Sequence, residues 1–154
     1  MTALTHDRST EYSLGDLLAV PVAAGEHIYG GSMVCLNAAG YAVPAADASG
    51  LVLAGVAVQG ADNAGGADGD AGVIVRRGGR YYFKWQRAVD QSAMGANVYV
   101  VDDQTVTADA ADVTHEVAAG VVDRVEDADN CWVAVGAAVL EGRSWSAPTT
   151  TTGT

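Results

Sequence analysis

The stretch GANVYVVDDQTVTADAADVTHEVAAGVV, Gly95 to Val122, has the pattern of one complete β unit. It contains two short β-rich runs around an Asp-Asp turn, then a loop and a third run closed by Ala-Gly-Val. An earlier stretch, GSMVCLNAAGYAVPAADASGLVLAGVA (Gly31 to Ala57), has the same order of glycines, turns and apolar pairs. We therefore interpret the two stretches as copies of one duplicated β unit. The matched positions include Ala45-Ala46-Asp47 with Ala110-Ala111-Asp112, and Ala54-Gly55-Val56 with Ala119-Gly120-Val121.

Composition favours strands over helices. The chain has 154 residues, enough for one domain with its own core, and its apolar content is mostly Ala and Val, with one Phe and 19 Gly. About ten short strands follow one another without a sustained helical period, which is typical of a barrel or sandwich. We expect an all-β fold, a compact small barrel or sandwich of two pseudo-repeats (about 17–75 and 81–136). The β domain would span 16–140, between an N-terminal arm (1–15) and a C-terminal tail (141–154).

Local signals refine this expectation. Pro21 predicts an edge position for the first strand, because proline cannot donate to a sheet. The run Leu51 to Val58 is continuously apolar, which indicates a strand buried on both faces. The segments 45–50 and 109–116 are each expected to form one helical turn. The last strand is expected to begin at Cys131 and run on to Leu140.

The charge balance excludes several classes of partner. Net charge is −11, and Lys84 is the only lysine. Such a surface repels nucleic acid. No apolar run is long enough to span a membrane, and the polar N-terminus predicts no secretion signal. The richness in Asp and scarcity of Lys fit either a high-salt environment or a high-GC genome, and the sequence leaves both open.

Metal, disulfide and catalytic signals are weak. Cys35 and Cys131 lie in apolar runs, which favours buried free thiols, although spacing alone leaves a disulfide open. The loop 59–71 is rich in Asp but lacks the spacing of a known calcium loop, so a solvated acidic turn is the favoured interpretation, with cation binding left open. The three histidines are scattered, and no nucleophile or phosphate-binding motif occurs. We expect no catalytic residue, cofactor or metal.

The most aromatic stretch of the chain is YYFKW, and it is expected to be a strand. Side chains alternate between the faces of a strand, so Tyr81, Phe83 and Trp85 share one face and Tyr82 and Lys84 the other. The first face is interpreted as core. Tyr82 and Lys84 are then candidate contacts with a partner.

Three further candidate partner contacts lie in the terminal segments. Trp145 stands in a Ser- and Thr-rich tail with no core of its own, and Trp is enriched among interface anchors. Arg143 in the same tail and Arg8 in the arm complete the set.

The glycines and apolar pairs recur through most of the chain. Their order resembles that of the bacteriophage capsid cement, or head decoration, proteins. The likeness covers roughly residues 17–136, but Ser32 replaces an Asp usual in that family, the loop 59–71 is longer, and the arm and tail have no counterpart. The positions that carry it include Gly31-Ser32-Met33-Val34, Ala54-Gly55-Val56-Ala57, Gly72-Val73-Ile74-Val75, Gly79-Arg80-Tyr81-Tyr82-Phe83, Gly95-Ala96-Asn97-Val98-Tyr99-Val100 and Ala119-Gly120-Val121-Val122.

The resemblance implies a β-tulip-like protein on the outer surface of a tailed-virus capsid. It would be made in the host cytoplasm, form homotrimers and stabilise the shell by bridging subunits of the major capsid protein. Another virion part, such as a baseplate, fibre or turret domain, is an alternative. A polysaccharide-binding domain is a second alternative, with Tyr81, Tyr82 and Trp85 as a sugar platform.

Overall fold

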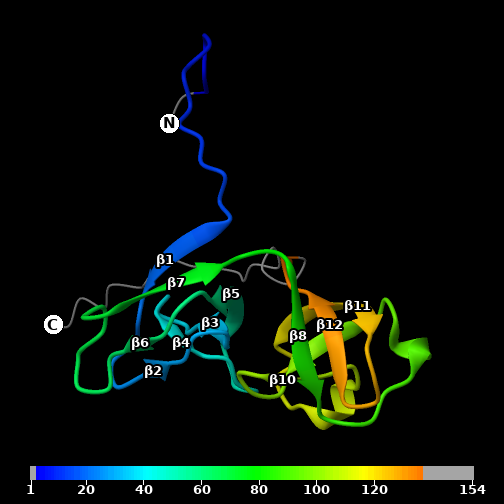
Figure 1. The fold of residues 1–154 in the computed structure, drawn as a ribbon. Coiled ribbons are helices and arrows are strands. Elements are labelled where there is room, and N and C mark those ends of the chain that lie inside the picture. Colours follow the sequence, from blue (N-terminus) through cyan, green and yellow to red (C-terminus); the bar gives the residue numbers. More distant parts are fainter. Residues whose placement is uncertain (1–2, 137–154) are drawn as a thin grey trace, which may run out of the picture.

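The first half of the chain forms an open sheet and the second half a closed barrel (Figure 1). The computed structural model describes residues 3–136, and these are nearly all strand and loop, which confirms the all-β prediction. The open sheet has the order β1-β7-β5-β3-β4, and a small two-stranded sheet, β2-β6, accompanies it. The strands of these two sheets are β1 (Leu17–Pro21), β2 (His27–Ile28), β3 (Met33–Leu36), β4 (Ala42–Pro44), β5 (Val52–Ala57), β6 (Ala61–Asp62) and β7 (Gly72–Arg76).

The second half of the chain, from β8 onward, forms the barrel. It closes in the order β10-β8-β12-β11-β9, and two single turns of 3-10 helix lie in its loops. Residues 3–16 form an arm that extends away from both halves (Figure 1). Among the described residues, no helix has the length and apolar character needed to cross a membrane. The elements are β8 (Arg80–Trp85), η1 (Gln91–Ala93), β9 (Asn97–Val100), β10 (Thr105–Thr107), η2 (Ala110–Asp112), β11 (Ala118–Val125) and β12 (Asn130–Ala134).

The two halves have the same strand order, because β1-β7-β5-β3-β4 corresponds position by position to β8-β12-β11-β9-β10. The registers also correspond. Leu17 pairs with Arg76 as Arg80 pairs with Ala134, and both pairs of strands are antiparallel. The two halves are therefore equivalent in strand order and in hydrogen-bonded register, as the duplicated sequence pattern predicts.

One residue explains why only the second half closes. In the barrel, the backbone N–H groups of Lys84 and Gln86 donate to the carbonyls of Gln104 (3.2 Å) and Val106 (2.9 Å). In the first half, Ala23 donates to Ala42 (2.9 Å), the counterpart of the Gln86 bond. The matched registers place Pro21 at the position of Lys84. Proline has no N–H, so the second closing bond cannot form. Only an isolated parallel bridge between Val22 and Ala42 then links the two ends of the sheet, and β1 is an edge strand, as predicted.

The halves share their hydrophobic core. The interior of the barrel continues into side chains from the facing side of the open sheet, among them Met33 and Val56. The other side of that sheet covers a second cluster that contains Val34 and Ala57. β5 contributes to both clusters and is buried from Leu53 to Ala57, which confirms the prediction of a strand buried on both faces.

Two local expectations were wrong. Residues 45–50 form no helical turn, because the Asp47 carboxylate instead accepts hydrogen bonds from the backbone of Thr114 and His115, both at 2.8 Å. The last strand ends at Ala134 and does not continue through residues 135–136, although the Val135 N–H still donates to the Gly79 carbonyl at 3.0 Å; residues 137–140 of the expected strand lie outside the described residues. The single turn expected within 109–116 is present as η2.

Both cysteines are buried and free, as the sequence favours. Burial raises the pKa of the Cys35 and Cys131 thiols to about 12. Both thiols therefore stay protonated at neutral pH and behave as small apolar side chains.

Candidate partner-binding face

Three side chains form a row across the outside of the barrel. Arg124 of β11 pairs with Trp132 of β12, and Trp132 pairs with Tyr82 of β8. Paired residues of neighbouring strands project to the same side of a sheet. The chain neighbours of Tyr82 and Trp132 include Phe83 and Cys131, which are buried in the barrel, so the row faces outward. We call it the aromatic–arginine row.

A bulge in β11 selects the residue that completes the row. The register shifts by one between Val122 and Arg124, which leaves Asp123 as the extra residue. Without that shift, the pairing of Val122 with Val133 would place Asp123 opposite Trp132. The bulge thus puts a guanidinium, rather than a carboxylate, beside the indole.

Contacts within the row fix its geometry. The Tyr82 and Trp132 rings meet edge to face, 5.5 Å apart at 62°. The Arg124 guanidinium carbon lies 5.2 Å from the centre of the Trp132 ring, a cation–π arrangement. The Glu126 carboxylate accepts from the indole Nε1 at 3.0 Å and pairs with Arg124 at 3.1 Å. The indole is therefore held in one orientation while the row remains half exposed.

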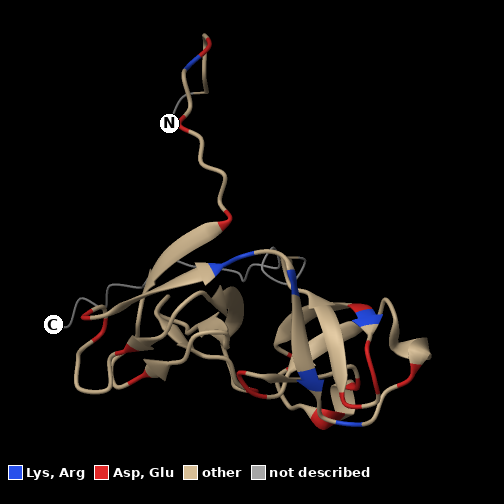
Figure 2. Ribbon diagram, viewed as in Figure 1, with Lys and Arg blue, Asp and Glu red and all other residues tan. Residues whose placement is uncertain are grey.

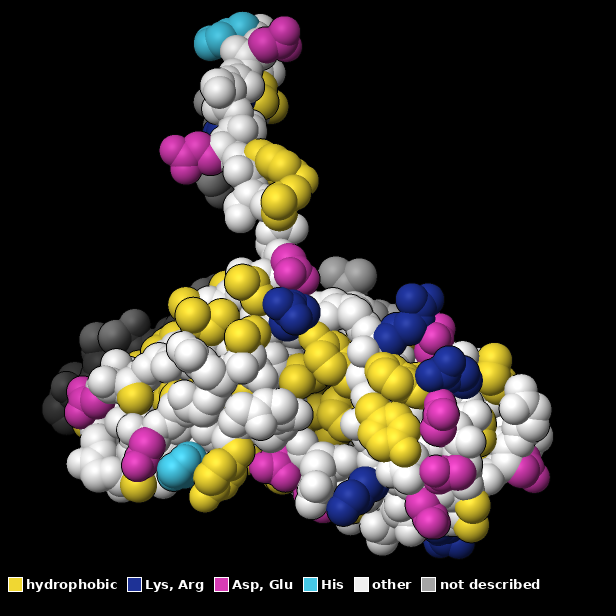
Figure 3. Space-filling view, in the orientation of Figure 1, with side chains coloured by type: hydrophobic (Ala, Val, Ile, Leu, Met, Phe, Trp, Pro, Cys, Tyr) yellow, Lys and Arg dark blue, Asp and Glu magenta, His cyan; other side chains and the backbone are white. Residues whose placement is uncertain are grey.

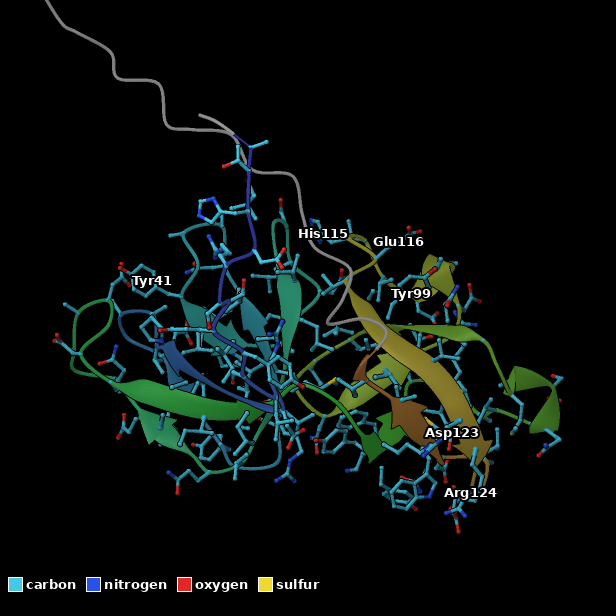
Figure 4. The ribbon with its side chains drawn as sticks, turned by 90° about the horizontal axis from the view of Figure 1, so that it is seen from above. Tyr41, Tyr99, His115, Glu116, Asp123 and Arg124 are labelled. Atoms are coloured by element: carbon cyan, nitrogen blue, oxygen red, sulfur yellow. The ribbon has the colours of Figure 1, made fainter. Side chains whose placement is uncertain are left out.

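A shallow depression adjoins the row. It has a volume of about 430 Å³ and includes the exposed Met94 and the Arg80–Asp123 ion pair, whose atoms are 2.7 Å apart. Viewed from above, Asp123 and Arg124 lie together at the end of β11 away from His115 (Figure 4). Hydrophobic side chains emerge over β8 and β12 between basic and acidic groups (Figure 3).

Positive charge gathers near this face. Of the eight Lys and Arg in the chain, seven lie within residues 3–136, and five of those seven lie on β7, β8, β11 or the turn after β7. Figure 2 shows basic segments on β7, β8 and β11, with acidic segments beside them and throughout the loops. Three of these five form ion pairs, with Asp16, Asp123 and Glu126, so the surface carries charges of both signs. The five residues are Arg76, Arg77, Arg80, Lys84 and Arg124.

The five predicted contact residues lie in different parts of the molecule. Tyr82, 48% exposed, and Lys84 point outward from β8, which confirms the expected alternation of faces. Arg8 is exposed on the arm, where its Nε donates to the Thr10 hydroxyl at 3.3 Å, so the structure does not bring it to the row. Arg143 and Trp145 lie outside the described residues.

Sequence reasoning missed Trp132 and Arg124. The alternation in Cys131-Trp132-Val133 could have placed the indole outward, because its two neighbours are apolar and buried. No comparable signal marks Arg124, since its place depends on a bulge and on pairing between distant segments.

The Asp-rich loop is organised by its own backbone. Asp62, Asp68 and Asp70 accept hydrogen bonds from the backbone N–H groups of Ala64, Ala24 and Ala67, at 2.8–2.9 Å. The buried Asn63 amide lies 2.9–3.1 Å from the carbonyls of Val22, Ala23 and Ala67. Within residues 3–136, no three His, Cys, Asp or Glu side chains gather as a metal site.

The sugar platform of Tyr81, Tyr82 and Trp85 does not form. Trp85 is buried and Tyr81 packs against the core, so only Tyr82 of the three projects outward. Its aromatic neighbour on the surface is Trp132 instead.

Comparisons with family models, curated proteins and solved structures find no match. The case for a function therefore rests on the residues and geometry above, and above all on the aromatic–arginine row.

Proposed function

We propose that the chain is a structural decoration protein of a tailed-virus capsid. It binds the outer surface of the shell, bridges neighbouring subunits of the major capsid protein and stabilises them. The observation that carries this proposal is the aromatic–arginine row, an oriented Arg, Trp and Tyr set on the wall of a closed barrel. The glycine and apolar pattern shared with head decoration proteins supplies the class of partner.

The row has the composition of a binding hot spot. Trp, Tyr and Arg are the residues most enriched among those that dominate the free energy of protein association. Trp132 is already held by Tyr82, Arg124 and Glu126, so little side-chain entropy is lost when a partner covers it. A partner surface with an apolar pocket and a polar rim would match it.

Binding by copies in a homotrimer would strengthen attachment without new contacts. Linked sites raise the effective concentration of the second and third contacts, so individually weak faces give firm attachment. The protein would act by binding alone, with no catalytic residue or cofactor, and would reside on the virion surface after synthesis in the host cytoplasm.

The test is binding to capsids that lack the protein. We expect saturable binding by the wild-type chain, and Trp132→Ala to weaken it at least about tenfold, the effect of losing a hot-spot side chain. Tyr29→Ala is the matched control, because Tyr29 is an exposed aromatic outside the row. If wild-type protein fails to bind any expanded head, the function is wrong. If Trp132→Ala binds like wild type, the row is not the contact.

The outward-facing pair of Tyr82 and Trp132, beside a depression that contains the Arg80–Asp123 ion pair, favours polysaccharide binding as a second candidate. Aromatic faces stack on sugar rings, and Arg80 and Asp123 could bond hydroxyl groups. A glycan screen with wild type and Trp132→Ala separates the two candidate functions. Polysaccharide binding predicts that wild type binds a glycan and that the variant does not, whereas capsid decoration predicts no glycan binding by either protein. Counting copies per virion separates a decoration protein (hundreds) from a baseplate, fibre or turret part (tens or fewer).

A further inference from the structure

The first half of the molecule has its own counterpart of the aromatic–arginine row. Ala19 of β1 pairs with Ile74 of β7 at the register positions of Tyr82 and Trp132. Val58, just after β5, donates its backbone N–H to the Ile74 carbonyl at 2.9 Å and so completes the row. Here all three residues are aliphatic. Together with Leu17 on the same side of β1, they form what we call the apolar face.

The apolar face is open to solvent. Val58 is 50% exposed and Leu17 53%, and Ile74 is also exposed, although its neighbours Val73 and Val75 are buried. Hydrophobic side chains are visible at the surface over β1 and β7 in Figure 3. A contiguous aliphatic patch on a strand at a sheet edge is a site that proteins normally cover.

The arm carries the matching apolar side chains. Tyr12 is 85% and Leu14 86% exposed, and they are two residues apart, so an extended arm presents both on one side. The structure gives residues 3–15 no backbone hydrogen bond to either half, and the arm points away from the body (Figure 1). Apolar groups on arm and face are thus both in water in a single copy, which is unfavourable for each.

Charge and reach favour a second copy as the occupant. The arm carries Asp7 and Glu11, whereas Arg76 and Arg77 flank the apolar face. Asp16, at the base of the arm, pairs with Arg76 at 3.6 Å, which shows that an arm carboxylate can reach this cation. Twelve extended residues span about 40 Å, enough to reach a neighbouring molecule.

We propose that copies of the chain join by arm exchange, with residues 3–14 of one copy lying on the apolar face of the next. Because arm and face are different surfaces, the contact is head to tail and closes into a ring when the rotation allows. The proposed function supplies only the expectation that the ring contains three copies. The contact itself stands on the exposed arm and face.

The test begins with sedimentation analysis of the full chain at several concentrations, without capsids. Wild type is expected to form a discrete oligomer, and deletion of residues 3–14 or the change Ile74→Asp to give monomers with unchanged circular dichroism. Tyr29→Ala, away from the face, is the control and should assemble like wild type. A wild-type monomer, or an oligomer that survives arm deletion, overturns the proposal. So does dissociation on deleting 141–154 but not the arm.

A second measurement guards against misfolded variants. A fluorescent peptide of residues 3–16 should bind the arm-deleted protein and bind its Ile74→Asp form at least about tenfold more weakly. Equal binding to the two forms overturns the proposal. Since neither experiment contains capsids, arm exchange can fail while head binding by wild type persists, and the reverse, so its failure is distinct from that of the proposed function.

Discussion

Gly55 and Gly120 occupy equivalent positions in the two halves, and both are required by the backbone. Their φ angles are 150° and 143°, where other residues are strained. A Cβ at either position would lie 2.3 Å from a carbonyl oxygen, that of Arg76 or of Ala134. Each glycine lies at a register shift where β5 or β11 crosses its neighbours, so the repeated Ala-Gly-Val pattern records a repeated close approach.

We predict that Gly55→Ala and Gly120→Ala each lower the free energy of unfolding by at least about 2 kcal/mol, because backbone strain and a clash with backbone atoms add. Urea denaturation followed by circular dichroism measures this. Gly65→Ala is the matched control, since no atom lies within 4 Å of its Cβ, and its effect should stay within about 0.5 kcal/mol. Equal stabilities for Gly120→Ala and Gly65→Ala would contradict the argument.

At the scale of elements, the loop after β4 is tied to the loop before β11 by one carboxylate. Hydrogen bonds from the backbone N–H groups of Thr114 and His115 hold the pKa of Asp47 below its ordinary value. The matching residue of the second half, Asp112, instead bonds Arg87 and Thr107 within its own half. The two copies of the sequence pattern thus use the same aspartate differently, and Asp47 joins the halves.

The lowered pKa of Asp47 predicts a pH-dependent effect of Asp47→Asn. A carboxylate with a depressed folded pKa stabilises above its unfolded pKa, and this contribution is lost as pH falls through the folded value. Wild type should therefore melt above Asp47→Asn at pH 7, and the gap should shrink below the ordinary pKa of 3.8. Thermal melts of both proteins from pH 7 to pH 2.5 measure the gap. A gap that does not change with pH would show that the charge is irrelevant.

The sequence predicted much at the scale of single strands. Alternation placed Tyr82 and Lys84 outward, continuous apolarity buried β5, and Pro21 marked an edge strand. It could not predict the aromatic–arginine row, because that row joins residues from three strands whose register depends on the bulge at Asp123. Periodicity is a local signal, whereas register is decided by long-range packing.

The sequence also did not predict that the first half forms an open sheet and the second a closed barrel. The two halves differ at one closing hydrogen bond, which the backbone N–H of Lys84 donates and Pro21 cannot. The equivalence of those two residues becomes visible only when the registers of β1 and β8 are compared. A proline that reads as an edge signal in the sequence is, in the structure, the reason that the first half remains an open sheet.

At the scale of the whole molecule, charge is divided unevenly. Most of the described cations lie along β7, β8 and β11, whereas acidic side chains occur throughout the loops (Figure 2). With a net charge of −11, the acids away from that surface repel one another in the folded state. Stability should therefore depend on how far their fields extend through the solvent.

We predict that salt stabilises the protein. Raising KCl from 0.1 M to 1 M shortens the screening length from about 10 Å to about 3 Å, which weakens repulsion between acids on neighbouring loops. The melting temperature at pH 7 should rise by several degrees, most steeply at the lower concentrations, and NaCl should match KCl because screening depends on ionic strength. A continuing linear rise that differs between salts would indicate surface hydration instead. No rise at all would favour genome composition, rather than a saline environment, as the origin of the acidic sequence.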